Sequence, residues 1–103
     1  MENMTGLQQF ILFALIAGGT VAHLADAYYT SKGLAKGFKE ANPVSAWLFK
    51  KIGFALTVFL SGALFIFAAL LLSMLTAVGS IVFAGAITAL ETYMAIRNKK
   101  LLT

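Results

Sequence analysis

Long apolar stretches separated by short polar segments dominate the chain. The first stretch covers residues 7–29, and the second covers residues 52–90 without a single charged side chain. As helices they would be roughly 34 Å and roughly 58 Å long, against a bilayer hydrocarbon core of about 30 Å. The first stretch therefore predicts one membrane-spanning helix. The second is too long for one span, so it must turn back and form two.

The turn inside the second stretch is expected where small and polar residues cluster, at Ser73, Thr76, Gly79 and Ser80. We expect transmembrane helices at about 7–30, 52–73 and 79–97, within a single transmembrane domain of residues 1–103. A secretory signal peptide is the competing interpretation of the first stretch, with residues 25–27 as a cleavage site. Residues 1–9 contain no Lys or Arg, which argues against it.

A shorter helix is predicted between the first two spans. Asn42 is a good N-cap, and Pro43 suits the first helical position. Three apolar residues then share one helix face: Val44, Trp47 and Leu48. This pattern predicts a short amphipathic helix at residues 43–51 on the cytoplasmic face, with three residues at head-group depth: Trp47, Lys50 and Lys51.

The surroundings of this short helix are also predictable in part. It either continues directly into the second span or bends near Gly53. Residues 31–39 include Gly33 and Gly37 and are expected to form a flexible connector.

Composition supports an all-α integral membrane protein. Hydrophobic residues make up 60% of the chain and charged residues 12%, whereas soluble domains have about 45–50% and about 25%. The chain has no cysteine, which excludes disulfides and thiolate chemistry. It also lacks the sequence motifs of zinc proteases, serine hydrolases and phosphate-binding loops. We therefore expect no enzymatic activity and no cofactor.

The distribution of charge predicts the topology. All eight basic residues lie in the segment between the first two spans or in the C-terminal tail. With three spans, these two regions are on the same side, and the positive-inside rule places that side in the cytoplasm. The N-terminus is then outside, and the protein is a multi-pass protein of the cell (inner) membrane. Basic residues that flank apolar spans indicate contact with lipid head groups rather than nucleic acid.

Ionisable residues within the predicted spans are the candidate functional residues. Gly19, His23, Asp26 and Thr30 share one face of the first helix. A face of the last helix carries four further residues: Ala84, Thr88, Glu91 and Ala95. In antiparallel packing, the pair His23 and Asp26 would meet the pair Thr88 and Glu91 near the cytoplasmic side. A charge in hydrocarbon costs about 2.5–3.5 kcal/mol even on the lenient insertion scale, so these groups should find partners inside the bundle.

Two interpretations of these residues remain open. In the functional one, a proton or cation site is built from six residues: His23, Asp26, Thr30, Glu40, Asn42 and Glu91. A bound divalent metal is a variant of it, because imidazole and carboxylates suit such ions, but the sequence leaves metal binding unknown. In the structural interpretation, His23 and Asp26 hydrogen-bond across helices, and Glu91 pairs with a lysine of the connecting segment.

A resemblance to a known family rests on one segment of the chain. An Asp and a Thr near the end of the first helix precede a Gly-containing loop and a Glu-x-Asn-Pro motif: Asp26, Thr30, Gly37, Glu40, Asn42 and Pro43. This segment resembles a family of small bacterial and archaeal membrane proteins of unknown function. The resemblance implies that Asp26, Thr30, Glu40 and Asn42 form one local constellation. From the residues themselves, we expect Glu40 to accept a hydrogen bond from Thr30 or to share a proton or cation with Asp26. That arrangement would hold the short helix against the first span.

Three hypotheses for the function follow. The first is a non-enzymatic membrane protein that is homo-oligomeric and passes protons or ions through the polar site. Small residues four apart, which permit close helix approach, suit this assembly or the internal bundle: Ala14, Gly18 and Ala22, and Gly85 and Ala89. The second is a holin-like phage lysis protein, which has a similar length, topology and basic tail. The third is an accessory subunit of a larger membrane complex.

Overall fold

Four helices make up the part of the chain that the structure describes, residues 4–40 and 42–102 of a computed structural model. They are α1 (Gly6–Ala35), α2 (Pro43–Ile52), α3 (Phe54–Ser73) and α4 (Ala77–Leu102). Three of them, α1, α3 and α4, are long and apolar enough to cross a membrane. The prediction of an all-α chain with three candidate spans is therefore confirmed.

Two helices, α1 and α4, extend beyond their predicted bounds. Helix α1 continues to Ala35, so the first half of the predicted flexible connector is helical. Lys32, Leu34 and Ala35 are good helix formers. Buried Gly33 also packs against Phe38, whose N–H donates to the Gly33 carbonyl at 2.9 Å. Helix α4 begins at Ala77 and ends at Leu102, where 79–97 was expected.

Local sequence signals explain where α2 begins and ends. The Asn42 side chain accepts hydrogen bonds from the N–H groups of Val44 and Ser45, as predicted for an N-cap. Gly53 separates α2 from α3 with φ +92° and ψ 159°, a conformation essentially restricted to glycine. The chain thus bends at Gly53. Whether α2 lies at a membrane interface remains a prediction.

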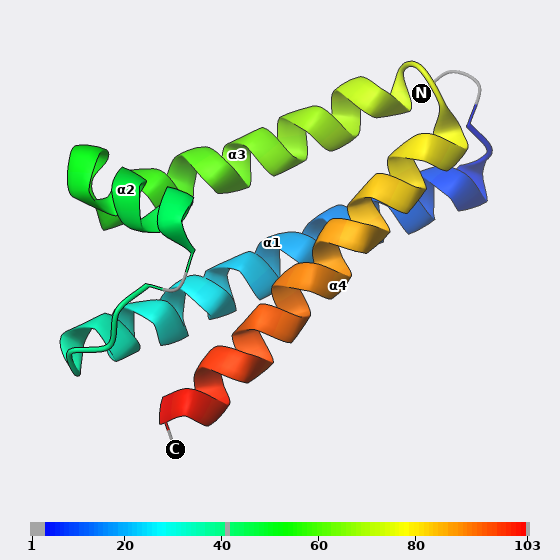
Figure 1. Cartoon of the computed structure of the whole chain (residues 1–103). Helices are drawn as coiled ribbons and strands as arrows, with labels where there is room; N and C mark the ends of the chain where they lie inside the picture. The colour runs from blue at the N-terminus through cyan, green and yellow to red at the C-terminus, as the bar shows by residue number, and fades with distance from the viewer. Residues whose placement is uncertain (1–3, 41, 103) are drawn as a thin grey trace.

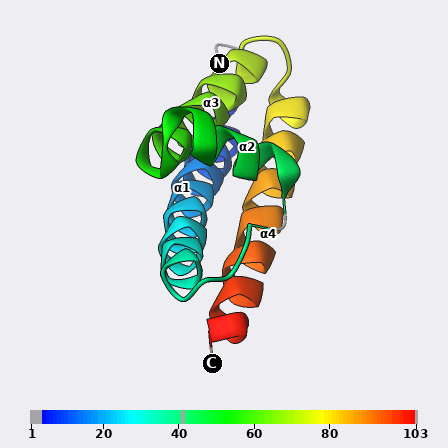
Figure 2. The same cartoon turned by 60° about the vertical axis from the view of Figure 1, so that its left-hand side comes forward.

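Helices α1 and α4 form the closest pair and run parallel along most of their length (Figure 1). The expected antiparallel packing of these two helices is wrong, because α3 returns the chain and both helices run toward the same end. Helix α3 meets them beside the α3–α4 turn and diverges from α1 toward its own N-terminal end, where α2 packs against it (Figures 1 and 2). The α3–α4 turn and the start of α1 lie at one end of the molecule. We call the opposite end the basic end. It contains the end of α1, the connector, α2 and the end of α4, and so all eight basic residues.

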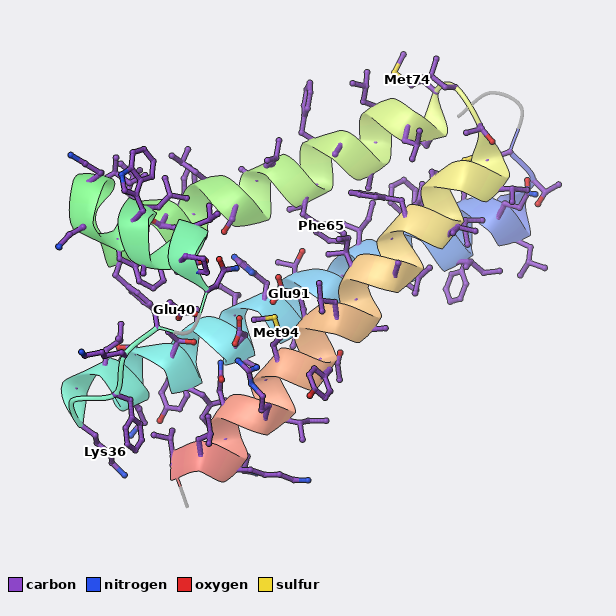
Figure 3. All side chains as sticks on the ribbon, viewed as in Figure 1. Lys36, Glu40, Phe65, Met74, Glu91 and Met94 are labelled. Atoms are coloured by element: carbon purple, nitrogen blue, oxygen red, sulfur yellow. The ribbon has the colours of Figure 1, made fainter. Side chains whose placement is uncertain are left out.

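The apolar core lies between the three long helices toward the α3–α4 turn. Its buried members are Met4, Leu12, Ile16, Ala69 and Ala84. The side chain of Phe65 extends from α3 toward the other two long helices (Figure 3), and its ring lies 6.1 Å from that of Phe83.

Close approach of the long helices depends on Gly19. A Cβ atom there would lie 2.7 Å from Thr88 Oγ1 and 2.8 Å from Phe65 Cζ. Thr88 in turn donates a hydrogen bond from Oγ1 to the Leu15 carbonyl at 2.9 Å. Small residues therefore let α1, α3 and α4 touch at this level, as such residues do in membrane helix pairs.

Candidate functional site: a polar cavity near the basic end

A cavity of about 140 Å³ opens where α3 stands apart from α1. Three of the chain's four acidic residues line it, together with its single histidine: Asp26, Glu40, Glu91 and His23. They come from α1, the connector and α4, and Figure 3 shows Glu40 and Glu91 on the side that faces α3. No Lys or Arg is among the residues that line this cavity. The fold thus gathers most of the negative charge of a basic chain in one place.

His23 occupies the boundary between all three long helices. Its Nδ1 lies 3.3 Å from Glu91 Oε1, and its Nε2 lies 3.0 Å from the Val58 carbonyl oxygen. Gly62 makes room for the ring, because a Cβ there would lie 3.2 Å from His23 Cδ2. The His23 side chain is 16% exposed, and that of Glu91 is 20% exposed.

The partners of His23 define how many protons the site holds. A carbonyl oxygen only accepts hydrogen bonds, so Nε2 must carry a proton to bond to Val58. The other nitrogen, Nδ1, faces a carboxylate oxygen, and this second contact also requires one proton, on either Nδ1 or Glu91 Oε1. The pair is therefore an imidazolium–carboxylate or a neutral imidazole–carboxylic acid, related by transfer of one proton across 3.3 Å.

The second carboxylate oxygen of Glu91 has no partner. Oε2 is buried and makes no hydrogen bond within the described residues, where Arg97 Nε is the only other buried side-chain nitrogen or oxygen without one. A buried polar atom without a partner loses the hydrogen bonds that water would provide. Glu91 can therefore gain from a water, proton or cation in the cavity that its side chain lines.

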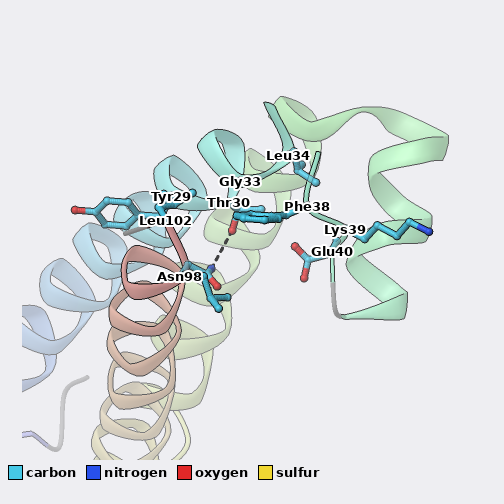
Figure 4. Close-up of a pocket in the computed structure, with 10 residues that line it drawn as sticks. Tyr29, Thr30, Gly33, Leu34, Phe38, Lys39, Glu40, Asn98 and Leu102 are labelled. Carbon is cyan, nitrogen blue, oxygen red and sulfur yellow. Dashed lines mark hydrogen bonds between the residues drawn. The ribbon is translucent and has the colours of Figure 1, made fainter. Parts of the chain in front are cut away.

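A second polar network lies beside the first. The Asn98 amide of α4 donates to both Asp26 Oδ1 and Thr30 Oγ1 of α1, the latter at 3.1 Å. The bond to Thr30 is drawn in Figure 4, which shows an adjoining cavity of about 60 Å³ that Thr30, Glu40 and Asn98 also line. These hydrogen bonds connect α1 to α4 between the His23–Glu91 pair and the basic end.

Glu40 and Asn42 make other contacts than those expected from the sequence. Glu40 lines the polar cavity with Asp26 and Thr30, but its Oε1 accepts from the Asn42 N–H at 3.0 Å, whereas the Thr30 hydroxyl is bound to Asn98. Asn42 caps α2 and does not line the cavity. The short helix packs against α3 instead of α1, since the bend at Gly53 folds α2 back on α3.

Other site predictions can be compared with the observed contacts. His23 meets Glu91 at one level, but Thr88 binds the Leu15 carbonyl and Asp26 binds Asn98. The ion pair between Glu91 and a lysine of the connecting segment is wrong, because the carboxylate faces His23. Within residues 4–40 and 42–102, no three His, Asp or Glu side chains lie close enough together to hold a metal ion.

The predicted interfacial residues lie on α2 at the basic end. Trp47 is 57% exposed, and Lys50 and Lys51 are exposed in the last helical turn. Their depth in a bilayer remains a prediction.

Two participants in the site were missed from the sequence, Asn98 and Ser61. Asn98 lies seven residues after Glu91, on the same helix face, but it falls outside a helix that ends at residue 97. Ser61 Oγ lies 3.1 Å from His23 Nε2, and Ser61 follows Thr57 by four residues on α3. The spacing of Thr57 and Ser61, two polar residues one helical turn apart, could have indicated Ser61. No sequence feature could have indicated the Val58 carbonyl, because every residue has a backbone carbonyl group.

The comparisons with known proteins add no family to these observations. No protein-family model matches the chain, and neither a curated protein nor a solved structure does. The candidate site therefore stands on its own residues and geometry.

Proposed function

We propose that this chain is a non-enzymatic, multi-pass protein of the cell (inner) membrane that binds a proton or a small cation in its polar cavity. The three candidate spans support insertion, and the single basic end supports an external N-terminus and a cytoplasmic C-terminus. In this orientation the cavity lies toward the cytoplasmic side, within reach of that compartment.

One observation carries the proposal: three of four acidic residues and the only histidine line one cavity that no Lys or Arg lines. Charged groups in a membrane protein are costly, and they mark proton relays and ion paths. If Asp26 and Glu40 are ionised beside a His23–Glu91 pair of zero net charge, the cavity carries two negative charges. A proton or a small cation is the ligand that such a cavity attracts.

The hydrogen bonds at His23 favour this role over hydrolysis. A serine nucleophile needs a histidine nitrogen that accepts its proton. His23 Nε2 is instead the donor to the Val58 carbonyl, and the Ser61 hydroxyl lies 2.9 Å from the Thr57 carbonyl, to which it donates.

Assembly of several copies of the chain into a homo-oligomer is part of the proposal. The outer face of α3 supports it with exposed large apolar side chains, including Phe59, Leu64 and Phe67, which contact lipid or further copies of the chain. Passage of ions across the membrane would require a second opening, because the half of the bundle beyond Gly19 is filled by apolar side chains.

The test measures proton and cation binding by purified protein in micelles. Infrared spectra recorded during acid titration report protonated carboxyl groups, and thermal unfolding in sodium, potassium or a bulky organic cation at constant ionic strength reports cation binding. We expect Glu91→Gln to lose one component of the titrating carboxyl band of wild-type protein, or to lose the dependence of the wild-type unfolding midpoint on the cation.

The control is Glu2→Gln, which removes the same charge from the one acidic residue outside the described cavity lining. It should behave like wild type. The proposal is wrong if Glu91→Gln removes no component of the carboxyl band and wild-type protein shows no cation effect, or if both variants lose the signal equally.

A further inference from the structure

A separate groove lies at the basic end, between the end of α1 with its connector and the facing side of α2. Its volume is about 650 Å³. Leu34, Phe38 and Lys39 line it on one side, with Glu40, and α2 contributes Ala46, Trp47, Phe49 and Lys50. Apolar side chains thus form most of the walls, and each wall supplies one lysine.

The two lysines of this groove are not paired with an acidic side chain among the described residues. Neither Lys39 nor Lys50 makes a hydrogen bond or an ion pair within the described residues. Glu40 is the one carboxylate in the lining, and its Oε1 is bound to the Asn42 N–H. Figure 4 shows Lys39 and Glu40 extending in opposite directions, so the ammonium group points away from that carboxylate. The groove lining therefore carries two lysines and one carboxylate, a net positive formal charge that favours an anionic ligand.

If α1 spans the membrane, as proposed above, the groove lies at the depth of the head groups. Helix α1 has 30 residues, which gives roughly 45 Å, about 15 Å more than the hydrocarbon core. Its last turn, with Leu34, therefore extends past the core at the basic end. Trp47 and Phe38 are 57% and 50% exposed beside it. Aromatic rings together with lysines are the side chains that membrane–water interfaces favour.

We propose that this groove binds an anionic phospholipid. Its phosphate lies between Lys39 and Lys50, and an acyl chain runs along Leu34, Phe38 and Trp47. Basic pockets between helices on the cytoplasmic side recognise anionic head groups in this way. The inference rests on the membrane insertion proposed above but not on proton or cation binding in the polar cavity.

Trp47 is the only tryptophan of the chain and lines the groove, so it can report a bound lipid directly. The full-length protein is placed in phosphatidylcholine nanodiscs that contain a small fraction of lipid brominated on its acyl chains, which quenches nearby tryptophan fluorescence. The brominated lipid is phosphatidylglycerol in one series and phosphatidylcholine in the other. We expect stronger quenching by phosphatidylglycerol, with a local enrichment on the order of tenfold from two lysines.

Two charge-matched variants locate the effect. Lys39→Gln with Lys50→Gln should abolish the preference, whereas Lys99→Gln with Lys100→Gln removes the same charge from the end of α4 and should keep it. Trp47→Phe combined with Leu71→Trp moves the reporter to an exposed position near the opposite end of α3 and should show no preference. Circular dichroism confirms that each variant retains wild-type helicity.

Several outcomes would overturn the proposal. Equal quenching by both lipids would show that the groove does not select anionic lipid. Equal loss of preference in both lysine pairs would mean that diffuse charge, not the groove, attracts it. Absence of quenching even at a high fraction of brominated phosphatidylcholine would contradict membrane insertion, and with it the function proposed above.

The lipid groove and the polar cavity can be tested independently. A loss of proton or cation binding in Glu91→Gln with unchanged lipid preference would show that the groove binds lipid independently of the polar cavity.

Discussion

The two halves of this bundle differ in packing: one is closely packed and apolar, and the other contains a polar cavity. Toward the α3–α4 turn, Leu12, Ile16 and Ala84 are buried together, and Gly19 leaves no room for a methyl group. Toward the basic end, α3 diverges from α1, and the space between them holds a cavity lined by Asp26, Glu91 and other polar side chains. Apolar helices without polar side chains gain by packing closely, whereas ionisable groups need partners and room for water or ions. The difference indicates that the packed half holds the helices together, whereas the open half has the room and the polar groups that our proposal requires.

Adding a methyl group at Gly19, in the packed half, should have the largest effect on stability. Gly19→Ala places a Cβ 2.7 Å from Thr88 Oγ1 and 2.8 Å from a Phe65 ring atom. Such overpacking costs about 1–3 kcal/mol. Reversible unfolding in mixed micelles measures this loss.

The neighbouring glycine is the matched control for that experiment. A Cβ at Gly18 would meet only Thr88 Cγ2, at 3.8 Å, which is an ordinary contact. Gly18→Ala should therefore be neutral or slightly stabilising. Equal losses in the two variants would show that α1, α3 and α4 do not meet at Gly19.

Removing an interhelical hydrogen-bond donor from the open half should have a smaller effect on the free energy of unfolding. Asn98→Ala deletes the donor to Asp26 and to Thr30. Interhelical hydrogen bonds in membrane proteins average about 0.6 kcal/mol, so two of them predict a loss of about 1 kcal/mol. The same unfolding measurement detects it.

Thr92→Ala is the control for Asn98, because its hydroxyl bonds only to the Thr88 carbonyl of its own helix. It should cost less than Asn98→Ala. If the order is reversed, the contact between Asn98 and α1 does not stabilise the open half.

The smallest effect is expected for Asp26→Asn, which should leave the mass of the oligomer unchanged. Asp26 bonds to Asn98 of the same chain, and an asparagine oxygen accepts the same bond. We expect a defined homo-oligomer in wild type and the same mass in the variant, measured by light scattering with the detergent contribution subtracted. A monomer in both would argue against a pore formed by this chain alone, and dissociation by the variant would place Asp26 in the contacts between copies.

Much of the fold could be predicted because its signals are local. The charge-free stretch at residues 52–90 is too long for one span, and Asn42 with Pro43 marks the start of α2. Helix ends were less predictable. Gly33 suggested a loop, but its packing against Phe38 keeps it within α1. A local signal therefore fails where a contact made by folding outweighs it.

The candidate site was predictable only in part. His23, Asp26 and Glu91 were identified because charge is rare and costly inside an apolar span. Asn98 and Ser61 were missed because amides and hydroxyls at a span end or on an apolar helix are unremarkable until their partners are known. The position of Glu40 depends on the path of the connector, which no periodicity describes.

The sequence by itself determined the apolar spans, the gathering of basic residues into two segments, and the small set of ionisable residues placed among apolar ones. These properties follow from composition along a single chain. Only the tertiary structure decided that His23 lies between Glu91 and the Val58 carbonyl, that Asn98 joins Asp26 to Thr30, and that α2 packs on α3. The reason is physical. The contacts of His23 and Asn98 join residues 35 to 72 positions apart, so they require α1, α3 and α4 to pack together, and the packing of α2 depends on the direction of the bend at Gly53.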